Sequence, residues 1–432
     1  MRIVKSNKDM LTFYKILKGR SINSPEIEKN VKTILDDVRR NGDRALLKYT
    51  RAFDFQKAKE LKIKPNEISR YAGKADRKVV RALKLSAKRI RAFHEMQKEE
   101  SWFVRDPEYR RFSPHTFLGQ VIRPIERVGV YVPGGKASYP STVLMNVIPA
   151  QVAGVKEIAL CVPTPEGEIN PYVMAAIKLL GVKEVYRIGG AQAIGAMAYG
   201  TEMIKRVDKI VGPGNIYVAT AKRLVFGEVD IDIIAGPSEI LIIADDSANP
   251  AFVAADLLSQ AEHDELALSV LITDSKRLAD AVDKELIGQL AKLKRREIVR
   301  KSIDNYGAII ITKDIKDAVE LSNHIAPEHL EVMTKNPMDV LPMIKNAGAI
   351  FLGEWTPEPL GDYSAGPNHT LPTGGTARFS SPLGVYDFVK RSSLISFTKE
   401  GFIKLAGTVE ALADIEGLEA HGNTIRIRKE KK

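Results

Sequence analysis

The sequence contains a single cysteine and no long apolar run. Cys161 is the only cysteine among 432 residues, which excludes disulfide bonds and metal sites built from cysteine. No stretch approaches the roughly 20 apolar residues of a membrane-spanning helix, and the opening segment MRIVKSNKDM lacks the apolar middle of a secretory signal. We therefore expect a soluble, cytoplasmic protein with no membrane partner. Any metal must be held by histidine, carboxylate or amide ligands.

The net charge is +11, but most of the chain has no excess of positive charge. Residues 1–111 carry 30 Lys and Arg against 15 Asp and Glu, so the remaining 321 residues sum to −4. In that basic end the charges follow helical text such as DRKVVRALKLSAKRIRAFHEMQ, without interleaved aromatic residues. This distribution favours a solvated helix face and leaves a nucleic-acid-binding protein as a minor alternative.

The length and the changing texture of the sequence indicate several parts, because 432 residues exceed one ordinary core. We expect a mostly helical N-terminal region over 1–110, part of which packs on the second of two α/β domains. The first α/β domain covers 120–232, and the second covers 233–380. A small C-terminal tail over 381–432 contains a strand, SLISF, and a helix.

Short apolar strands alternate with helical segments in both middle parts. RVGVYVPGG, EIALCVP, EVYRIGG and DKIVGPG are β-rich runs, and each precedes a helical segment. The rhythm repeats from residue 233 and includes one long charged helix over about 276–304. This alternation predicts an α/β fold with two Rossmann-like parallel-sheet domains. In the N-terminal region, Ser24-Pro25 has the pattern of a helix start, with Ser as the cap and Pro at the first position.

Glycine-rich turns follow the expected strands of the first α/β domain. PGG at 133–135, GG at 189–190 and GPG at 212–214 stand where open α/β sheets bind ligands, at the carboxyl ends of strands. None fits G-x-G-x-x-G, because Gln192 occupies the middle glycine position of IGGAQAIGA. The standard dinucleotide motif is therefore absent, and tight turns alone explain these glycines about as well as a ligand does.

Histidine and carboxylate residues gather in the second α/β domain. Gln260 and His263 are three apart near the end of a predicted helix and share a face. Glu328-His329 pairs a carboxylate with an imidazole, and Asp362 opens a glycine-rich loop. Although a lone histidine is usually structural, this grouping indicates a catalytic zinc site beside an acid–base pair. A zinc hydrolase that uses Glu328 to activate water is an alternative, but it leaves the glycine-rich turns unexplained.

A series of motifs, from about residue 120 to the C-terminus, resembles the successive blocks of the histidinol dehydrogenase family. In order, the motifs are RVGVYVPGGKASYPSTVLMNVIPAQVAGV, GGAQAIGAMAYGT, KIVGPGNIYVATAKR, AGPSEILIIAD, DLLSQAEHDELA, IAPEHLEV, GDYSAGPNHTLPTGGTARFSSPLGV and EGLEAHGNTIRIR. The resemblance implies a zinc-dependent homodimer that oxidises L-histidinol to L-histidine through histidinal with two NAD, the last steps of histidine biosynthesis.

The resemblance also implies a role for each of twelve residues. It assigns zinc to Gln260, His263, Asp362 and His421, acid–base catalysis to Glu328 and His329, and NAD contacts to Tyr131, Gln192 and Asn215. It assigns substrate contacts to Ser238, His369 and Glu416, together with the four zinc ligands and His329. We expect His329 to take the hydroxyl proton and Glu328 to activate water for the aldehyde step.

Two of these assignments go beyond what the residue types alone suggest. Ligand chemistry favours Glu262 or Asp264 over Gln260, because an amide oxygen is a weaker zinc donor. Helical spacing nevertheless agrees with the resemblance, since Gln260 and His263 share a face from which Glu262 points away. The tail that carries His421 looks too small to own a core. We therefore expect the partner subunit to be the surface that it packs on, with His421 and Glu416 donated across the interface.

Overall fold

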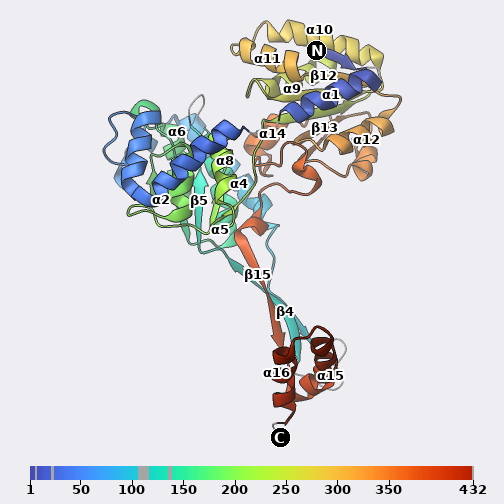
Figure 1. Ribbon diagram of the computed structural model, residues 1–432. Coiled ribbons are helices and arrows are strands. Elements are labelled where there is room, and N and C mark those ends of the chain that lie inside the picture. The colour runs from blue at the N-terminus through green and yellow to red at the C-terminus, as the bar shows by residue number, and fades with distance from the viewer. Residues whose placement is uncertain (5–6, 21–23, 106–115, 135–138, 431–432) are drawn as a thin grey trace. The chain divides into compact units, whose positions relative to one another are not determined.

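The structure is a computed structural model of the chain (Figure 1), and it describes residues 1–430 except 5–6, 21–23, 106–115 and 135–138. Contacts divide the chain into two units. The larger contains Met1–Gln97 and Ile125–Phe388, and the smaller contains Lys98–Pro124 and Val389–Lys432. Because the contacts set no boundary at residue 232, the four-part division given above stays a prediction.

The first sheet of the larger unit has a doubly wound topology. Its strand order is β2-β7-β6-β5-β8-β9, and every pair is parallel except β2 with β7. Without β2, the order is 3-2-1-4-5 along the chain, the arrangement of a Rossmann-like domain. The strands are β2 (Lys62–Ile63), β5 (Arg127–Tyr131), β6 (Glu157–Cys161), β7 (Glu184–Tyr186), β8 (Lys209–Val211) and β9 (Asp230–Ile231), and the crossover helices are α5 (Pro140–Ala153), α6 (Pro171–Leu180), α7 (Gly190–Tyr199) and α8 (Ile216–Val225).

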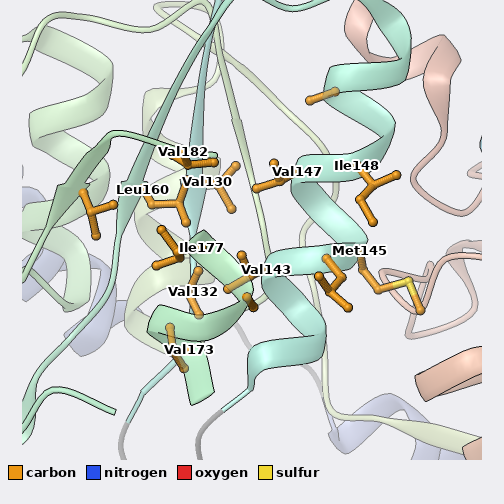
Figure 2. Packing of buried hydrophobic residues seen from close by; sticks show 14 of the residues in the cluster. Val130, Val132, Val143, Met145, Val147, Ile148, Leu160, Val173, Ile177 and Val182 are labelled. Atoms are coloured by element: carbon orange, nitrogen blue, oxygen red, sulfur yellow. The ribbon is translucent and has the colours of Figure 1, made fainter. Parts of the chain in front are cut away.

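Helices cover both faces of this sheet, which explains why its strands are apolar throughout. On one face, Val143 and Val147 of α5 and Ile177 of α6 lie beside Val130 and Leu160 of the strands (Figure 2). On the other face, α7 and α8 pack against alternate strand residues such as Tyr131 and Cys161. Cys161 is buried in β6, within the run EIALCVP that the sequence predicts to be a strand.

The N-terminal helices divide between the two sheets. Helices α2 (Pro25–Phe53), α3 (Pro65–Ala72) and α4 (Arg77–Glu95) pack on the helices of the first sheet. Strand β1 (Arg2–Val4) instead pairs with the second sheet, and α1 (Asn7–Gly19) contributes Phe13 to a core of that sheet. The predicted start of α2 is confirmed, because the Ser24 side chain accepts a hydrogen bond from the Ile27 N–H and Pro25 is the first helical residue.

The second sheet repeats the topology of the first. Its order is β1-β12-β11-β10-β13-β14, all parallel, and without β1 it is again 3-2-1-4-5. The predicted α/β fold with two Rossmann-like sheets is therefore confirmed. The strands are β10 (Glu239–Ala244), β11 (Leu268–Thr273), β12 (Ala308–Ile311), β13 (His329–Met333) and β14 (Ala349–Leu352), and the helices are α9 (Pro250–Ala261), α10 (Lys276–Leu290), α11 (Arg296–Tyr306), α12 (Ile315–Ile325), α13 (Pro337–Val340) and α14 (Glu358–Leu360).

The long helix expected over 276–304 is wrong. The structure has two helices there, α10 and α11, separated by the turn at 291–295. A straight helix of that length would extend roughly 43 Å, far beyond strands of six residues that span about 20 Å. Breaking the helix lets both halves pack on α9, so tertiary packing overrides helix propensity here.

The smaller unit combines an antiparallel sheet with two helices. The sheet has the order β15-β4-β3, with strands β3 (Trp102–Arg105), β4 (Phe117–Pro124) and β15 (Val389–Ser396). The single helix expected after SLISF is in fact two, α15 (Lys399–Ile415) and α16 (Glu419–Glu430). Gly417 lies between them with a positive φ of 69°, a conformation that glycine adopts without strain. Throughout the described ranges, every helix is too short or too polar to cross a membrane.

Candidate active site

Glu328 and His329 lie at the amino-terminal edge of the second sheet. His329 is the first residue of β13 and pairs with Ile240, the second residue of β10. Ala326 ends α12 in a left-handed conformation, and Pro327 then leads the chain into Glu328. Ligands of open α/β sheets usually bind at the carboxyl ends of strands. In this sheet the candidate residues occupy the opposite edge.

The backbone of Glu239 holds both side chains. Glu328 Oε2 accepts a hydrogen bond from the Glu239 N–H at 2.8 Å, and His329 Nδ1 lies 2.9 Å from the Glu239 carbonyl oxygen. Because a carbonyl oxygen only accepts, Nδ1 carries a proton and the neutral ring keeps its lone pair on Nε2. Among the described residues Nε2 has no hydrogen-bond partner, and it lies 3.7 Å from Asp362 Oδ1 and 3.8 Å from Glu358 Oε1.

Burial and charge shift the ionisation of this group. Burial raises the pKa of Glu328 to about 8, although His329 opposes the shift. Burial also disfavours the charged form of His329, but Glu328, Asp362 and Glu358 outweigh it and raise the pKa of His329 to about 10. Contacts with His329 hold the pKa of Asp362 below its usual range despite burial. A cation beside these carboxylates would offset their charge and lower the pKa of His329.

Three side chains converge where they could hold a metal ion. One nitrogen of His263 and one carboxylate oxygen from each of Glu358 and Asp362 lie within 4.8 Å of one another. His263 follows α9, Glu358 begins α14, and Asp362 lies in the π-helical turn Gly361–Ala365. Gln260 Oε1 is buried and has no hydrogen-bond partner in the described part of the chain. The imidazole and the two carboxylates of this group fit a borderline or hard divalent cation.

The two acidic residues that ligand chemistry favoured stand apart from this cluster. Asp264 is exposed, and its Oδ1 accepts a hydrogen bond from the Leu266 N–H at 3.0 Å, which stabilises the turn after α9. Glu262 is the C-cap of α9 and is half-buried. Neither belongs to the group of possible metal ligands, whereas His263 does.

The loop around His369 joins the two sheets of the larger unit. His369 Nδ1 lies 3.0 Å from the Asp362 carbonyl oxygen, and His369 Nε2 lies 3.5 Å from Thr142 Oγ1. The Asn368 side-chain amide donates to the Met145 carbonyl oxygen at 2.6 Å. Thr142 and Met145 belong to α5, which follows the carboxyl end of β5. The carboxyl edge of the first sheet and the amino edge of the second therefore meet across this loop.

The glycine-rich turns of the first sheet surround its switch point, between β5 and β8. The Tyr131 hydroxyl accepts a hydrogen bond from the Gly190 N–H at 3.2 Å. Gly212 has a φ of 113°, and a Cβ there would lie 2.1 Å from the Tyr131 carbonyl oxygen. Buried Lys222 donates to the Gly212 carbonyl oxygen at 3.0 Å and pairs with Asp232, which also accepts from the Gly212 N–H. The close approach of the turn at Gly212 to the end of β5 thus requires glycine.

The polar side chains expected to contact NAD lie at these turns. Gln192 is buried on α7, and both atoms of its amide lack a hydrogen-bond partner within the described ranges. The Asn215 side chain caps α8 and accepts hydrogen bonds from the Tyr217 and Val218 N–H groups. Gly135, the last residue of the first turn, lies outside the described residues. Unused amide donors and acceptors at a switch point fit a polar ligand such as a nucleotide.

Three other predicted residues have different places. Ser238 directly precedes β10, next to the Glu239 backbone that holds the acid–base pair. His421 is exposed on α16, and Glu416 is the C-cap of α15, so both belong to the smaller unit. Their assignment to the metal and the substrate stays a prediction.

Sequence reasoning missed Glu358 and Glu331. Glu358 is buried and belongs to the group of possible metal ligands, and Glu331 Oε1 accepts a hydrogen bond from the Glu358 N–H at 2.7 Å. Both had a signal in the sequence. Glu358 stands four residues before Asp362, one helical turn away, and Glu331 shares a strand face with His329 at a spacing of two.

Comparison with known proteins identifies the family. The model of the histidinol dehydrogenase family matches residues 17–429. The chain is 56% identical over 413 residues to a histidinol dehydrogenase of Syntrophotalea carbinolica, covering 95% of this chain and 94% of that protein. The chain belongs to the histidinol dehydrogenase family. A histidinol dehydrogenase of Geobacter metallireducens is 53% identical over 426 residues, 98% of this chain and 96% of that protein.

A solved structure of the same family agrees. The crystal structure of histidinol dehydrogenase from Elizabethkingia anophelis superposes with a TM-score of 0.91 at 37% identity, covering 99% of this chain and 96% of that chain. Histidinol dehydrogenases are oxidoreductases that convert L-histidinol to L-histidine in histidine biosynthesis. The substrate is therefore a small molecule, and the expected enzyme class is confirmed.

Proposed function

We propose that this chain carries out the two oxidations with zinc at the His263–Asp362 cluster and NAD at the turns of the first sheet. The observation that carries the proposal is the arrangement around His329. Its Nε2 is free of hydrogen bonds to described residues and faces the metal cluster, while its Nδ1 is held by the Glu239 carbonyl group. A base with a fixed tautomer beside a cation cluster suits abstraction of a proton from a bound alcohol.

In this proposal, Gln260, His263 and Asp362 hold the zinc together with the partner's His421. The unbonded, buried Oε1 of Gln260 supports its role, because a buried oxygen without a partner is costly unless a ligand satisfies it. Bound zinc would polarise and orient the histidinol atoms that it contacts. His369 lies beside Asp362, and Ser238 precedes the Glu239 backbone that binds Glu328, so in this proposal both contact the substrate.

The first oxidation requires His329 to act as a base. As hydride leaves the alcohol carbon for NAD, the hydroxyl proton goes to Nε2, and the carbon becomes the aldehyde. The loop at His369 contacts Thr142 and Met145 of α5, the helix that follows β5 in the first sheet, and this contact supports NAD binding at the turns of that sheet. Tyr131, Gln192 and Asn215 would hold the cofactor there.

The second oxidation requires water. Glu328 takes a proton from a water that adds to the aldehyde carbon, while His329 returns the proton from the first step to the former aldehyde oxygen. The resulting hydrate then gives its hydride to a second NAD and its hydroxyl proton to His329, which is neutral again. Burial raises the pKa of Glu328 to about 8, so the carboxyl group can both accept and release protons near neutrality. The two residues thus divide the work, with His329 serving both steps and Glu328 the second.

We also propose a homodimer whose sites are completed by the partner's His421 and Glu416. Val409, Leu412 and Ile415 recur along α15 at a spacing of three, and each side chain is exposed in the single chain. Ile415 alone is 81% exposed. Such a stripe needs a covering surface, and a second copy can provide one.

The direct test is turnover by the purified, zinc-loaded protein. With L-histidinol and NAD, we expect two NADH for each histidine formed. Failure to reduce NAD, or accumulation of histidinal with a single NADH, would contradict the proposed chemistry. A zinc chelator should abolish turnover, and added zinc should restore it.

A further inference from the structure

One arginine from the N-terminal region contacts the segment that holds the acid–base pair. Arg20 follows α1, and its side chain is 5% exposed. Nη1 donates to Glu239 Oε1 at 2.7 Å, Nη2 donates to the carbonyl oxygens of Pro237 and Ser238 at 3.2 Å, and Nε donates to the Leu266 carbonyl oxygen at 3.0 Å. The planar guanidinium therefore fixes two chain segments at once.

These contacts lie directly beside the catalytic groups. The Glu239 peptide N–H binds Glu328, and the Glu239 carbonyl oxygen binds His329. Leu266 lies three residues after His263, in the chain that returns from the metal cluster. A shift of the backbone at 237–239 would therefore move both acid–base residues.

The sheet alone does not hold this segment. The ladder between β10 and β13 begins at Ile240, and the ladder between β10 and β11 begins at Glu239. Before Glu239, the backbone hydrogen bond from the Leu268 N–H reaches the Ser238 carbonyl oxygen. Arg20 adds side-chain hydrogen bonds at Pro237 and Ser238, where the strand pairing ends. It also places a positive charge against the buried Glu239 carboxylate.

We propose that Arg20 is a positioning residue for Glu328, His329 and Ser238. Its fork holds the 237–239 backbone in the geometry that orients the acid–base pair toward the substrate. This inference rests on the proposed roles of that pair. It also gives a function to the N-terminal region, which the sequence left without one. A lysine cannot substitute, because a single ammonium group lacks the fixed fork that reaches three carbonyl groups and a carboxylate.

The test compares Arg20→Met and Arg20→Lys with Arg127→Met. Arg127 is a matched control because it is also a buried arginine, paired with Glu157 and Glu184, but at the amino end of the first sheet. For both Arg20 variants we expect kcat for histidinol and for supplied histidinal to fall about 10–100-fold, as for loss of a supporting hydrogen-bond partner. KM for NAD and the zinc content should stay unchanged. Arg127→Met should lose thermal stability and keep kcat.

Turnover by the unaltered enzyme tests the proposed function separately from this inference. If the unaltered enzyme is active and Arg20→Lys keeps its full kcat, the positioning role is wrong. If Arg127→Met loses as much kcat as the Arg20 variants, the loss reflects lower stability in general. If the Arg20 variants lose zinc in step with kcat, Arg20 acts on metal binding. Either result overturns the proposal. Should Arg20→Met fail to fold, Arg20→Lys decides. Millimolar guanidinium should partly restore kcat in Arg20→Ala. Absence of this rescue would contradict a positioning role for the guanidinium group.

Discussion

The chemistry of single residues in this site depends on which partner each polar atom finds. His329 has two ring nitrogens, and the Glu239 carbonyl oxygen decides that Nε2 is the basic one. Gln260 Oε1 is buried without a hydrogen-bond partner among the described residues, whereas Asp264 is exposed and its Oδ1 accepts a hydrogen bond from the Leu266 N–H. The buried amide oxygen is therefore the atom that needs a ligand, because an unpaired buried acceptor is costly.

The first prediction concerns the metal ligands. We expect His263→Asn to stay folded, lose zinc and lose turnover by more than the roughly 10–100-fold cost of a supporting partner, because an imidazole ligand is removed. Asp264→Asn should keep both zinc and turnover, since Asp264 only stabilises a turn. Metal analysis and circular dichroism check the result. Full zinc occupancy with normal turnover in His263→Asn would show that the assignment is wrong.

The second prediction separates Glu328 from His329. Glu328→Gln should slow oxidation of supplied histidinal about 10²–10⁴-fold, the usual effect of losing a general base, and should affect formation of the first NADH much less. His329→Gln should slow both steps, because each releases a hydroxyl proton. Stopped-flow measurement of NADH in each half-reaction checks this division. Equal losses in both half-reactions of Glu328→Gln would refute it.

At this scale, residue types alone carried the prediction only part of the way. They indicate a His and carboxylate site, and the structure does bring His263 and Asp362 together. They favour Glu262 or Asp264 over Gln260, because donor strength is visible in a sequence and the satisfaction of a buried oxygen is not. They also missed Glu358, whose place in the cluster depends on how the chain returns after β14.

At the scale of helices and strands, the sequence predicts the elements better than it predicts which edge of a sheet carries the candidate residues. The alternation of strands and helices predicts both sheets. The single helix expected over 276–304 is two helices, because both halves pack on α9, and the sequence has no local signal for that packing. The rule that ligands bind at carboxyl ends agrees with the turns of the first sheet. In the second sheet the candidate residues lie at the opposite edge, because His329 begins its strand.

The third prediction concerns the amino ends of β5, β6 and β7, which Arg127 joins through Glu157 and Glu184. Burial acts to raise the pKa of Glu184, but hydrogen bonds from Arg127 and Tyr186 outweigh it and lower the pKa below its ordinary 4.5. A lowered pKa stabilises the fold above the unfolded-state value, and the gain is lost as the pH falls through the folded value. Glu184→Gln should therefore cost roughly 1–2 kcal/mol at neutral pH.

The difference between Glu184→Gln and the unaltered protein should shrink as the pH falls below about 4. Thermal unfolding as a function of pH measures it. Glu157→Gln is the control, because its side chain is 54% exposed and solvent weakens its pair with Arg127. A difference in stability between the two proteins that stays constant across the acid range would mean that the charge on Glu184 contributes nothing to stability.

The fourth prediction concerns the turns that would hold NAD. With no G-x-G-x-x-G motif and no acid placed to bind a ribose, the cofactor should bind weakly to the free enzyme. Binding should strengthen when histidinol is present, because the loop at His369 connects the two sheets. Calorimetry with and without substrate checks this. Tight binding of NAD alone would contradict it, and Gln192→Ala should weaken NAD binding without changing the zinc content.

At the scale of the whole molecule, each unit has exposed residues to which the proposed site assigns a role. In the larger unit the group of possible metal ligands has an exposed member, His263, and the smaller unit carries His421 together with the exposed apolar residues of α15. The sequence predicted a tail without a core of its own. It could not show that β3 and β4, which are distant in the chain, build that unit with β15, because strand pairing across such a separation has no local signal.

The fifth prediction tests whether two subunits share each site. His421→Asn and Asp362→Asn should both be inactive alone, because each removes a proposed zinc ligand. When the two variants are unfolded together and refolded, mixed dimers form. If the partner donates His421, a mixed dimer contains one site with both lesions and one intact site. With half of the dimers mixed, about a quarter of full activity should then return. If each site is built from one chain, every site of a mixed dimer keeps one lesion and no activity returns. A dimer of each variant refolded alone gives the baseline, and zinc content should rise in step with the recovered turnover.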